Sequence, residues 1–130
     1  MKRFIAFILS VLTSLVVMSC NKVPEQDIAY ERINAEEAKA IMDRESNYII
    51  IDARTQSEYD EGHIPDAILI PEYEIANKAC EFLKDKDQLI LVYCRSGRRS
   101  KIAAQALVDL GYTNVKEFGG IIDWKYEIER

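Results

Sequence analysis

The strongest constraint on the fold of this chain is a short loop that joins an apolar strand to an amphipathic helix. Residues Leu89–Tyr93 are apolar and partly β-branched, which predicts a strand buried on both faces of a sheet. Downstream, one helix face is predicted by apolar residues spaced at i, i+3, i+4 and i+7, namely Ala103, Ala106, Leu107 and Leu110. A buried strand followed closely by a helix is typical of a parallel α/β sheet.

The loop between them, Cys-Arg-Ser-Gly-Arg-Arg, carries one thiol and three guanidiniums. Ligands of open α/β sheets bind at the carboxyl ends of the strands, where the first amides of the next helix favour an anion. A glycine in this loop permits backbone angles that let successive N–H groups converge on one point. The predicted site therefore consists of Cys94 as nucleophile and of the anion-binding residues Arg95, Ser96, Gly97, Arg98 and Arg99.

The Cys94 thiol is expected to ionise easily. Amides at a helix start and neighbouring arginines both lower the pKa of a thiol and favour the thiolate. A single cysteine can also be an inert buried side chain. Three arginines within five residues of Cys94 favour a reactive role for it over a purely structural one.

The remainder of the chain alternates predicted strands with predicted helices. Asn34 followed by Glu37 has the spacing of an N-cap and an acidic third position, and it opens a helix that buries Ala38, Ile41 and Met42. Further strands are predicted at residues 30–33, 48–51, 67–70 and 115–118, and further helices at 55–61 (capped by Thr55 or Ser57), at 72–83 and, after Gly119-Gly120, around Ile121, Trp124 and Ile128. This alternation predicts an α/β fold whose parallel sheet is covered on both faces.

Three motifs together resemble the rhodanese family of sulfurtransferases. They are the Cys94–Arg99 loop, the stretch Ile51-Asp52-Ala53-Arg54 and the stretch Glu61-Gly62-His63-Ile64-Pro65-Asp66-Ala67, in the order and spacing of the family. The resemblance runs from about residue 33 to the C-terminus and departs from the family at Asp66, where glycine is usual. It implies one rhodanese domain, with a small parallel β-sheet flanked by helices on both faces.

Asp52 and Arg54 are the supporting residues of the predicted site. Asp52 ends a strand at the same edge of the sheet as the Cys94 loop, and Arg54 follows two residues later. Arg54 either faces the site or pairs with Glu58 as scaffolding, and we favour scaffolding because ion pairs near sites are common without catalytic duty. The resemblance implies the same role for this motif, and it implies that His63, the one histidine, is structural.

The first residues have the pattern of an export signal. Lys2 and Arg3 precede an apolar stretch over residues 4–18, and Val-Met-Ser-Cys then ends at Cys20 in the manner of a bacterial lipobox. We therefore expect a lipoprotein signal peptide at residues 1–19, a lipidated Cys20, a tether at 20–29 and the rhodanese domain at 30–130. The protein would be an exported bacterial lipoprotein, anchored to a membrane and facing the periplasm or the cell exterior. A plain signal peptide or an uncleaved anchor is the alternative, because methionine is less usual in a lipobox.

The net charge and the positions of the cysteines limit which ligands and partners the chain is expected to bind. Loss of Lys2 and Arg3 changes the formal net charge from −5 to −7, which argues against nucleic acid or anionic lipid as a partner. Scattered cysteines and one histidine lack the spacing of metal ligands, so neither metal nor cofactor is expected. Cys80 is expected to be structural within a helix, although an oxidising compartment leaves a Cys80–Cys94 disulfide open. A monomer is the default for a domain of this size.

Three activities are compatible with the Cys94 loop. The resemblance implies a sulfurtransferase that moves sulfane sulfur from thiosulfate or a similar donor to a thiol, cyanide or protein acceptor through a Cys94 persulfide. Phosphatase or arsenate chemistry uses a cysteine, five intervening residues and an arginine, but here Ser100 occupies that last position. A lipid-anchored redox-sensing or sulfur-binding module without turnover would carry the same cysteine.

Overall fold

The computed structural model describes residues 30–130, so the predicted signal peptide, Cys20 and tether lie outside the described residues. Five short strands alternate with helices along this part of the chain. In chain order the elements are β1 (Glu31–Arg32), α1 (Ala35–Arg44), β2 (Tyr48–Asp52), α2 (Gln56–Glu61), β3 (Ile68–Leu69), the 3₁₀ turn η1 (Glu72–Glu74), α3 (Ile75–Phe82), β4 (Leu89–Cys94), α4 (Arg98–Asp109), β5 (Val115–Gly120) and the 3₁₀ turn η2 (Ile121–Asp123).

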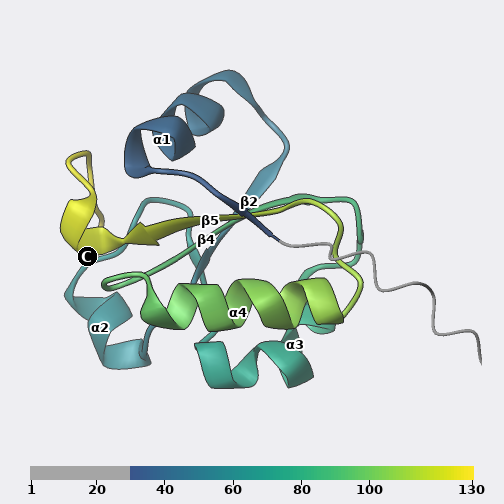
Figure 1. The fold of residues 1–130 in the computed structure, drawn as a ribbon. Coiled ribbons are helices and arrows are strands. Elements are labelled where there is room, and N and C mark those ends of the chain that lie inside the picture. The colour runs from purple at the N-terminus through teal and green to yellow at the C-terminus, as the bar shows by residue number, and fades with distance from the viewer. Residues whose placement is uncertain (1–29) are drawn as a thin grey trace, which may run out of the picture.

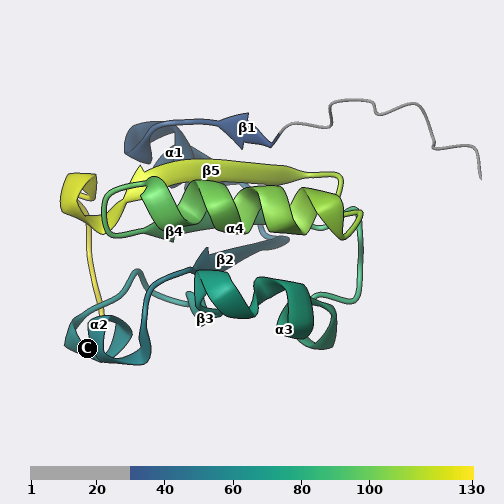
Figure 2. The ribbon, with the colours of Figure 1, turned by 60° about the horizontal axis from the view of Figure 1, so that its bottom comes forward.

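The strands form one parallel sheet in the order β1-β5-β4-β2-β3. Helix α1 covers one face of the sheet, and α3 and α4 cover the other (Figures 1 and 2). The central strand β4 is buried along nearly its whole length, as its apolar sequence predicts. The predicted parallel α/β fold with helices on both faces is therefore confirmed.

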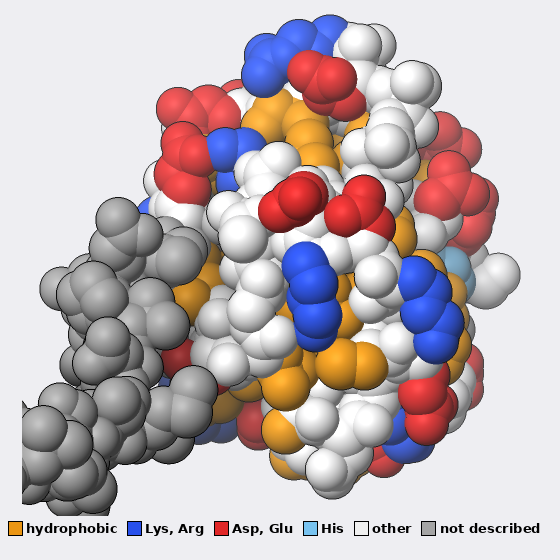
Figure 3. All heavy atoms as spheres, turned by 90° about the vertical axis from the view of Figure 1, so that its right-hand side faces the viewer, with side chains coloured by type: hydrophobic (Ala, Val, Ile, Leu, Met, Phe, Trp, Pro, Cys, Tyr) orange, Lys and Arg blue, Asp and Glu red, His pale blue; other side chains and the backbone are white. Residues whose placement is uncertain are grey.

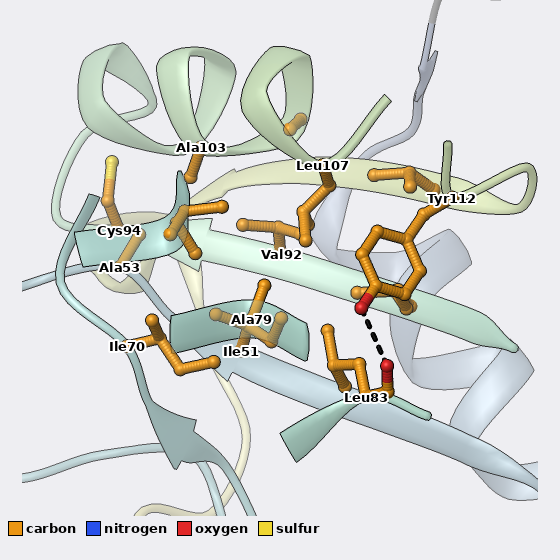
Figure 4. Packing of buried hydrophobic residues seen from close by; sticks show 14 residues of the cluster. Ile51, Ala53, Ile70, Ala79, Leu83, Val92, Cys94, Ala103, Leu107 and Tyr112 are labelled. Carbon is orange, nitrogen blue, oxygen red and sulfur yellow. Dashed lines mark hydrogen bonds between the residues drawn. The ribbon is translucent and has the colours of Figure 1, made fainter. Parts of the chain in front are cut away.

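Each face of the sheet has its own core. Between the sheet and α1, Ile50, Leu91 and Phe118 pack with Ala38 and Ile41. The larger core lies between the sheet and helices α3 and α4 (Figure 4). Cys94 lies at one end of this larger core, and Tyr112, whose hydroxyl donates to the Leu83 carbonyl at 2.6 Å, lies at the other.

Two predicted helix starts are confirmed in atomic detail. The Asn34 side chain accepts from the Glu37 amide at 2.8 Å, and the Glu37 carboxylate accepts from the Asn34 amide at 2.9 Å. Thr55 and Glu58 form the same reciprocal capping box at the start of α2. Asp66 takes a left-handed backbone angle, φ 66°, which explains how it replaces the glycine usual in the family.

The predictions for the C-terminal region are wrong in two respects. Strand β5 does not break at Gly119-Gly120, because Gly120 still pairs with Cys94 of β4. No C-terminal helix forms over residues 121–130 beyond the short turn η2. The chain instead runs back to His63, where the His63 and Glu129 amides and carbonyls exchange hydrogen bonds of 2.9 and 2.8 Å. These backbone bonds take the place of helical ones.

The structural role expected for Cys80 is also wrong. Helix α3 buries Ile75 and Ala79 but leaves Cys80 exposed and Phe82 half exposed. The Cys80 sulfur lies 3.6 Å from Lys86 Nζ, which itself lies over the Tyr112 ring. Cys80 is therefore at the Tyr112 end of the core, opposite Cys94, and both cysteines are free.

Charges of both signs are mixed on one face of the molecule. On the face seen in Figure 3, Lys and Arg side chains alternate with Asp and Glu side chains, and neither sign forms a continuous field. Within residues 30–130, no helix is both long and apolar enough to cross a membrane.

The pairing of Cys94 with Gly120 predicts a site-specific sensitivity to substitution. A Cβ at Gly120 would overlap the Arg95 carbonyl oxygen and lie 2.5 Å from the Ser96 nitrogen, so the loop would have to move. Gly120→Ala is expected to lower the free energy of unfolding by about 3 kcal/mol, the upper range of overpacking costs. Gly111→Ala, where the added methyl meets open space and only the left-handed φ of 94° is strained, is expected to cost about 1 kcal/mol. Urea unfolding measures both, and equal losses would contradict the close approach at Gly120.

Candidate active site

Cys94 lies at the carboxyl end of β4, and its side chain is enclosed by the loop that follows. The residue is only 1% exposed. Its sulfur accepts a hydrogen bond from the Gly97 amide at 3.0 Å and contacts the Ser100 hydroxyl at 3.3 Å. Gly97 has φ 104° and caps the start of α4, so the predicted left-handed glycine is what turns an amide back toward the sulfur.

The surroundings of the sulfur lower the pKa of the Cys94 thiol. Burial works against this, because it disfavours the charged form. The hydrogen bond between the sulfur and the Ser100 hydroxyl and those from the amides of Ser100, Gly97 and Ser96 outweigh it. The pKa is therefore lowered as the sequence predicts, but hydroxyl and amide dipoles rather than the arginines are the leading cause.

The three loop arginines have different surroundings. Arg99 forms two hydrogen bonds with the Glu58 carboxylate, at 2.6 and 2.8 Å, which tie α4 to α2. The hydrogen bond to Glu58 is the main reason that the pKa of Arg99 is raised, and the charge of Cys94 adds less. Arg95 and Arg98 are exposed. Two guanidiniums on the loop therefore remain accessible to an anion, while the third is held by a protein carboxylate.

Arg54 pairs with Asp52 and not with Glu58, which pairs with Arg99. Its guanidinium contacts Asp52 at 2.7 Å and donates to the Gly62 carbonyl at 2.6 Å. The Tyr93 hydroxyl also donates to Asp52, at 2.6 Å, and accepts from the Ile64 amide. Because Asp52 and Arg54 are 0% and 5% exposed, this buried network ties β2, β4 and the 62–64 segment together.

His63 is engaged away from the Cys94 loop. Its ring stacks on Tyr59 at 3.7 Å between centroids, and Nδ1 lies 3.0 Å from the Tyr59 carbonyl oxygen. Its other nitrogen, Nε2, lies 3.7 Å from the Glu129 carboxylate. These contacts fit the structural role that the resemblance implies. Within residues 30–130, no group of three His, Cys, Asp or Glu side chains is placed to hold a metal ion.

Sequence reasoning missed two buried residues of the site: Ser100, which contacts the sulfur, and Glu117, which contacts Ser100. Ser100 is buried in the first turn of α4, and its hydroxyl lies 2.6 Å from Glu117 Oε1. Glu117, in the middle of β5, is only 1% exposed. One signal could have found it: Glu117 lies two residues after the buried Val115, so strand alternation places both on the same face.

Comparison with known proteins identifies the family. A family model described as a rhodanese-like domain matches residues 34–127, more than half of the chain. The chain belongs to the rhodanese-like domain family. The thiosulfate sulfurtransferase PspE of Escherichia coli is 37% identical over 73 residues, which cover 56% of this chain and 70% of the relative.

Two further relatives extend the comparison. The adenylyltransferase and sulfurtransferase UBA4 of Candida albicans is 30% identical over 105 residues, 75% of this chain but only 24% of that longer protein. The solved structure of a rhodanese with anions from E. coli aligns with a TM-score of 0.61 and 32% identity, covering 64% of this chain and 98% of that one. The fold of this rhodanese-like domain is thus that of solved rhodaneses, and its relatives support a sulfurtransferase-type enzyme.

The Glu58–Arg99 pair predicts a pH-dependent contribution to stability. The Arg99 hydrogen bond lowers the pKa of Glu58 from 4.5 to about 2, and the Thr55 capping bonds assist. A depressed folded-state pKa stabilises the fold above the unfolded value, and that stabilisation is lost as the pH falls toward about 2. Glu58→Gln is expected to cost about 1 kcal/mol at neutral pH, the usual size for a partly exposed pair.

Urea unfolding of the parent and Glu58→Gln across acidic pH measures this contribution. The difference in unfolding free energy should shrink steadily below the ordinary glutamate pKa of 4.5. Glu81→Gln, at an exposed glutamate of α3, is the matched control and is expected to change stability by less than about 0.5 kcal/mol. If the loss of unfolding free energy in Glu58→Gln stays constant down to about pH 2.5, the assigned pKa shift of Glu58 is contradicted.

Proposed function

We propose that this rhodanese-like domain transfers sulfane sulfur through a persulfide on Cys94. The observation that carries the proposal is the enclosure of the Cys94 sulfur, which is buried but receives the Gly97 amide at 3.0 Å. Fixed dipoles of this kind stabilise a negative sulfur without having to reorganise during the reaction. A lowered thiol pKa increases the fraction of the nucleophilic thiolate.

The reaction has two balanced halves. The Cys94 thiolate attacks the outer sulfur of thiosulfate, a new S–S bond forms, the donor's S–S bond breaks, and sulfite leaves with the electron pair. A thiolate or cyanide acceptor then attacks the outer sulfur of the persulfide, and the Cys94 thiolate is regenerated. The exposed Arg95 and Arg98 on the loop would attract the dianionic donor and offset the charge of the departing sulfite.

The composition of the loop favours sulfur over phosphate or arsenate. At the place where a phosphatase loop carries its arginine, Ser100 turns inward and hydrogen-bonds Glu117 and Cys94 rather than facing an oxyanion. The PspE relative is named a thiosulfate sulfurtransferase, which supports thiosulfate as a donor. A module that only senses oxidants would share the reactive cysteine but would not turn over.

The cellular setting is part of the proposal and rests on sequence alone. A lipid on Cys20 would hold the domain at a membrane, with residues 20–29 as tether and the domain acting as a monomer on the exported side. The thiol or protein acceptor would then have to be reachable from that membrane surface.

The mass of the intact protein tests the persulfide directly. After incubation with thiosulfate, the chain is expected to gain the mass of one sulfur atom, and a cyanide chase should remove it. Cys94→Ser is expected to abolish the gain. Cys80→Ser removes the exposed thiol of α3 and should leave the gain intact. If no sulfur is gained while Cys94 remains alkylatable, the proposed function fails.

The exposed arginines predict a difference between donors. Arg98→Ala is expected to lower kcat/KM for thiosulfate roughly tenfold, because one charge interaction near a surface is worth on the order of 1 kcal/mol or more. The loss should be smaller for a polysulfide, which lacks the sulfonate group. Lys101→Ala, also on α4 but beside Tyr30 and Gln105, is the matched control. Equal losses for the two donors would contradict a role in binding the sulfonate end.

A further inference from the structure

A buried thiol needs a place for its proton before it can attack. Within residues 30–130, the groups in hydrogen-bond contact with the Cys94 sulfur are backbone amides, among them that of Gly97 at 3.0 Å, and one hydroxyl, that of Ser100. An amide N–H cannot accept a proton, so the hydroxyl is the remaining contact. The one histidine is held by Tyr59 and Glu129. A proton that Ser100 accepts must therefore be matched by one that Ser100 passes to another group in contact with it.

Behind Ser100 lies the carboxylate of Glu117. The Ser100 hydroxyl is 2.6 Å from Glu117 Oε1, the shortest of its contacts, against 3.0 Å to the Gly97 carbonyl and 3.3 Å to the Gly119 carbonyl. The Gly119 amide also donates to Oε1, at 2.8 Å. Thiol, hydroxyl and carboxylate thus form one continuous hydrogen-bonded chain from β4 through α4 to β5.

Glu117 differs from the other buried or half-buried acids near the loop. Asp52 contacts the Arg54 guanidinium at 2.7 Å, and Glu58 contacts that of Arg99 at 2.6 Å. A close guanidinium makes a carboxylate a poor proton acceptor. The cation beside Glu117 is Arg32 of β1, whose Nε lies 3.6 Å from Oε2 and whose side chain is 65% exposed. Arg32 therefore neutralises Glu117 less closely than the buried or half-buried guanidiniums neutralise Asp52 and Glu58.

We propose that Ser100 and Glu117 form a proton relay that ionises Cys94. The Cys94 S–H bond breaks as Ser100 Oγ gains that proton, and the Ser100 O–H bond breaks as Glu117 Oε1 gains the other. The negative charge moves from Glu117 to Cys94, and no electron or proton leaves the protein. Afterwards the Glu117 carboxylic acid donates to Ser100, and Ser100 donates to the thiolate. Every hydrogen bond of the chain is kept with its direction reversed.

This inference deepens the proposed function, because the thiolate is the form of Cys94 that attacks a sulfur donor. Ser100 touches the reacting sulfur, whereas Glu117 acts only through Ser100 and is a positioning residue that also receives the proton. The charged groups that face this route are Arg32 beside Glu117 and, at the other end, Arg99 with its partner Glu58. A purely structural Glu117 would only hold the Gly119 amide and the Ser100 side chain in place.

A Glu117 that accepts the proton and a Glu117 that only repels the thiolate through its charge predict opposite changes in Cys94 reactivity. The full chain carrying Cys20→Ser and Cys80→Ser retains Cys94 as its one cysteine, and the rate of iodoacetamide alkylation against pH reports its thiolate fraction. Glu117→Gln keeps the shape and an acceptor oxygen but cannot take the proton. The relay predicts that the alkylation rate at about pH 5 falls about tenfold, the effect of one pKa unit. A carboxylate that only repels the thiolate predicts a rise instead.

Variants at Ser100 keep the test decisive even if Glu117→Gln fails to fold. Ser100→Ala removes the middle of the relay and is expected to lower the acid-side rate, whereas Ser100→Thr restores a hydroxyl and should recover most of it. Glu31→Gln, at an exposed glutamate of β1, is the control and should leave the profile unchanged. An unchanged or raised rate in Glu117→Gln, or equal rates in Ser100→Ala and Ser100→Thr, would overturn the relay. Alkylation needs no sulfur donor, so failure of the relay and failure of sulfur transfer are separate results.

Discussion

The pairing of β4 with β5 places Cys94 beside Gly120, and the rest of the site depends on this close approach. A side chain at Gly120 would occupy the position of the Arg95 carbonyl, so the loop can follow its path only against a bare backbone. That path turns the Gly97 amide back onto the sulfur, and α4 then begins with Ser100 facing inward. The same pairing sets β5 against the start of α4 and brings Glu117 within 2.6 Å of Ser100.

Ion pairing divides the charged residues around the loop between scaffold and site. Arg54 neutralises the buried Asp52, and Arg99 of the loop neutralises Glu58. Both arginines thereby tie together segments that are distant in the chain, and both carboxylates keep a close cation. Arg95 and Arg98 remain exposed for an anionic donor. The negative charge of the Cys94 thiolate is stabilised mainly by hydroxyl and amide dipoles, which a bound ion cannot displace.

The features that sequence predicts well here are local ones. The apolar run at 89–93, the Asn34 and Thr55 caps and the permissive Gly97 follow from residue type and spacing, and the structure confirms each of them. Contacts between distant segments could not be predicted in this way. The Arg99–Glu58 pair joins residues 41 positions apart, and the Ser100–Glu117 bond joins two elements. The prediction of a C-terminal helix is wrong for the same reason: Glu129 pairs with the distant His63, and this pairing overrides the local helical pattern.

The central claim is that the Cys94 loop is built to hold an extra sulfur atom. A crystal structure determined after soaking with thiosulfate tests it most directly. The account predicts density for one added sulfur, bonded to Cys94 Sγ at about 2.05 Å and surrounded by the amides that follow Cys94. An unmodified Cys94 would contradict it. So would an intact donor that rests only on the exposed arginines, or added sulfur on Cys80 alone.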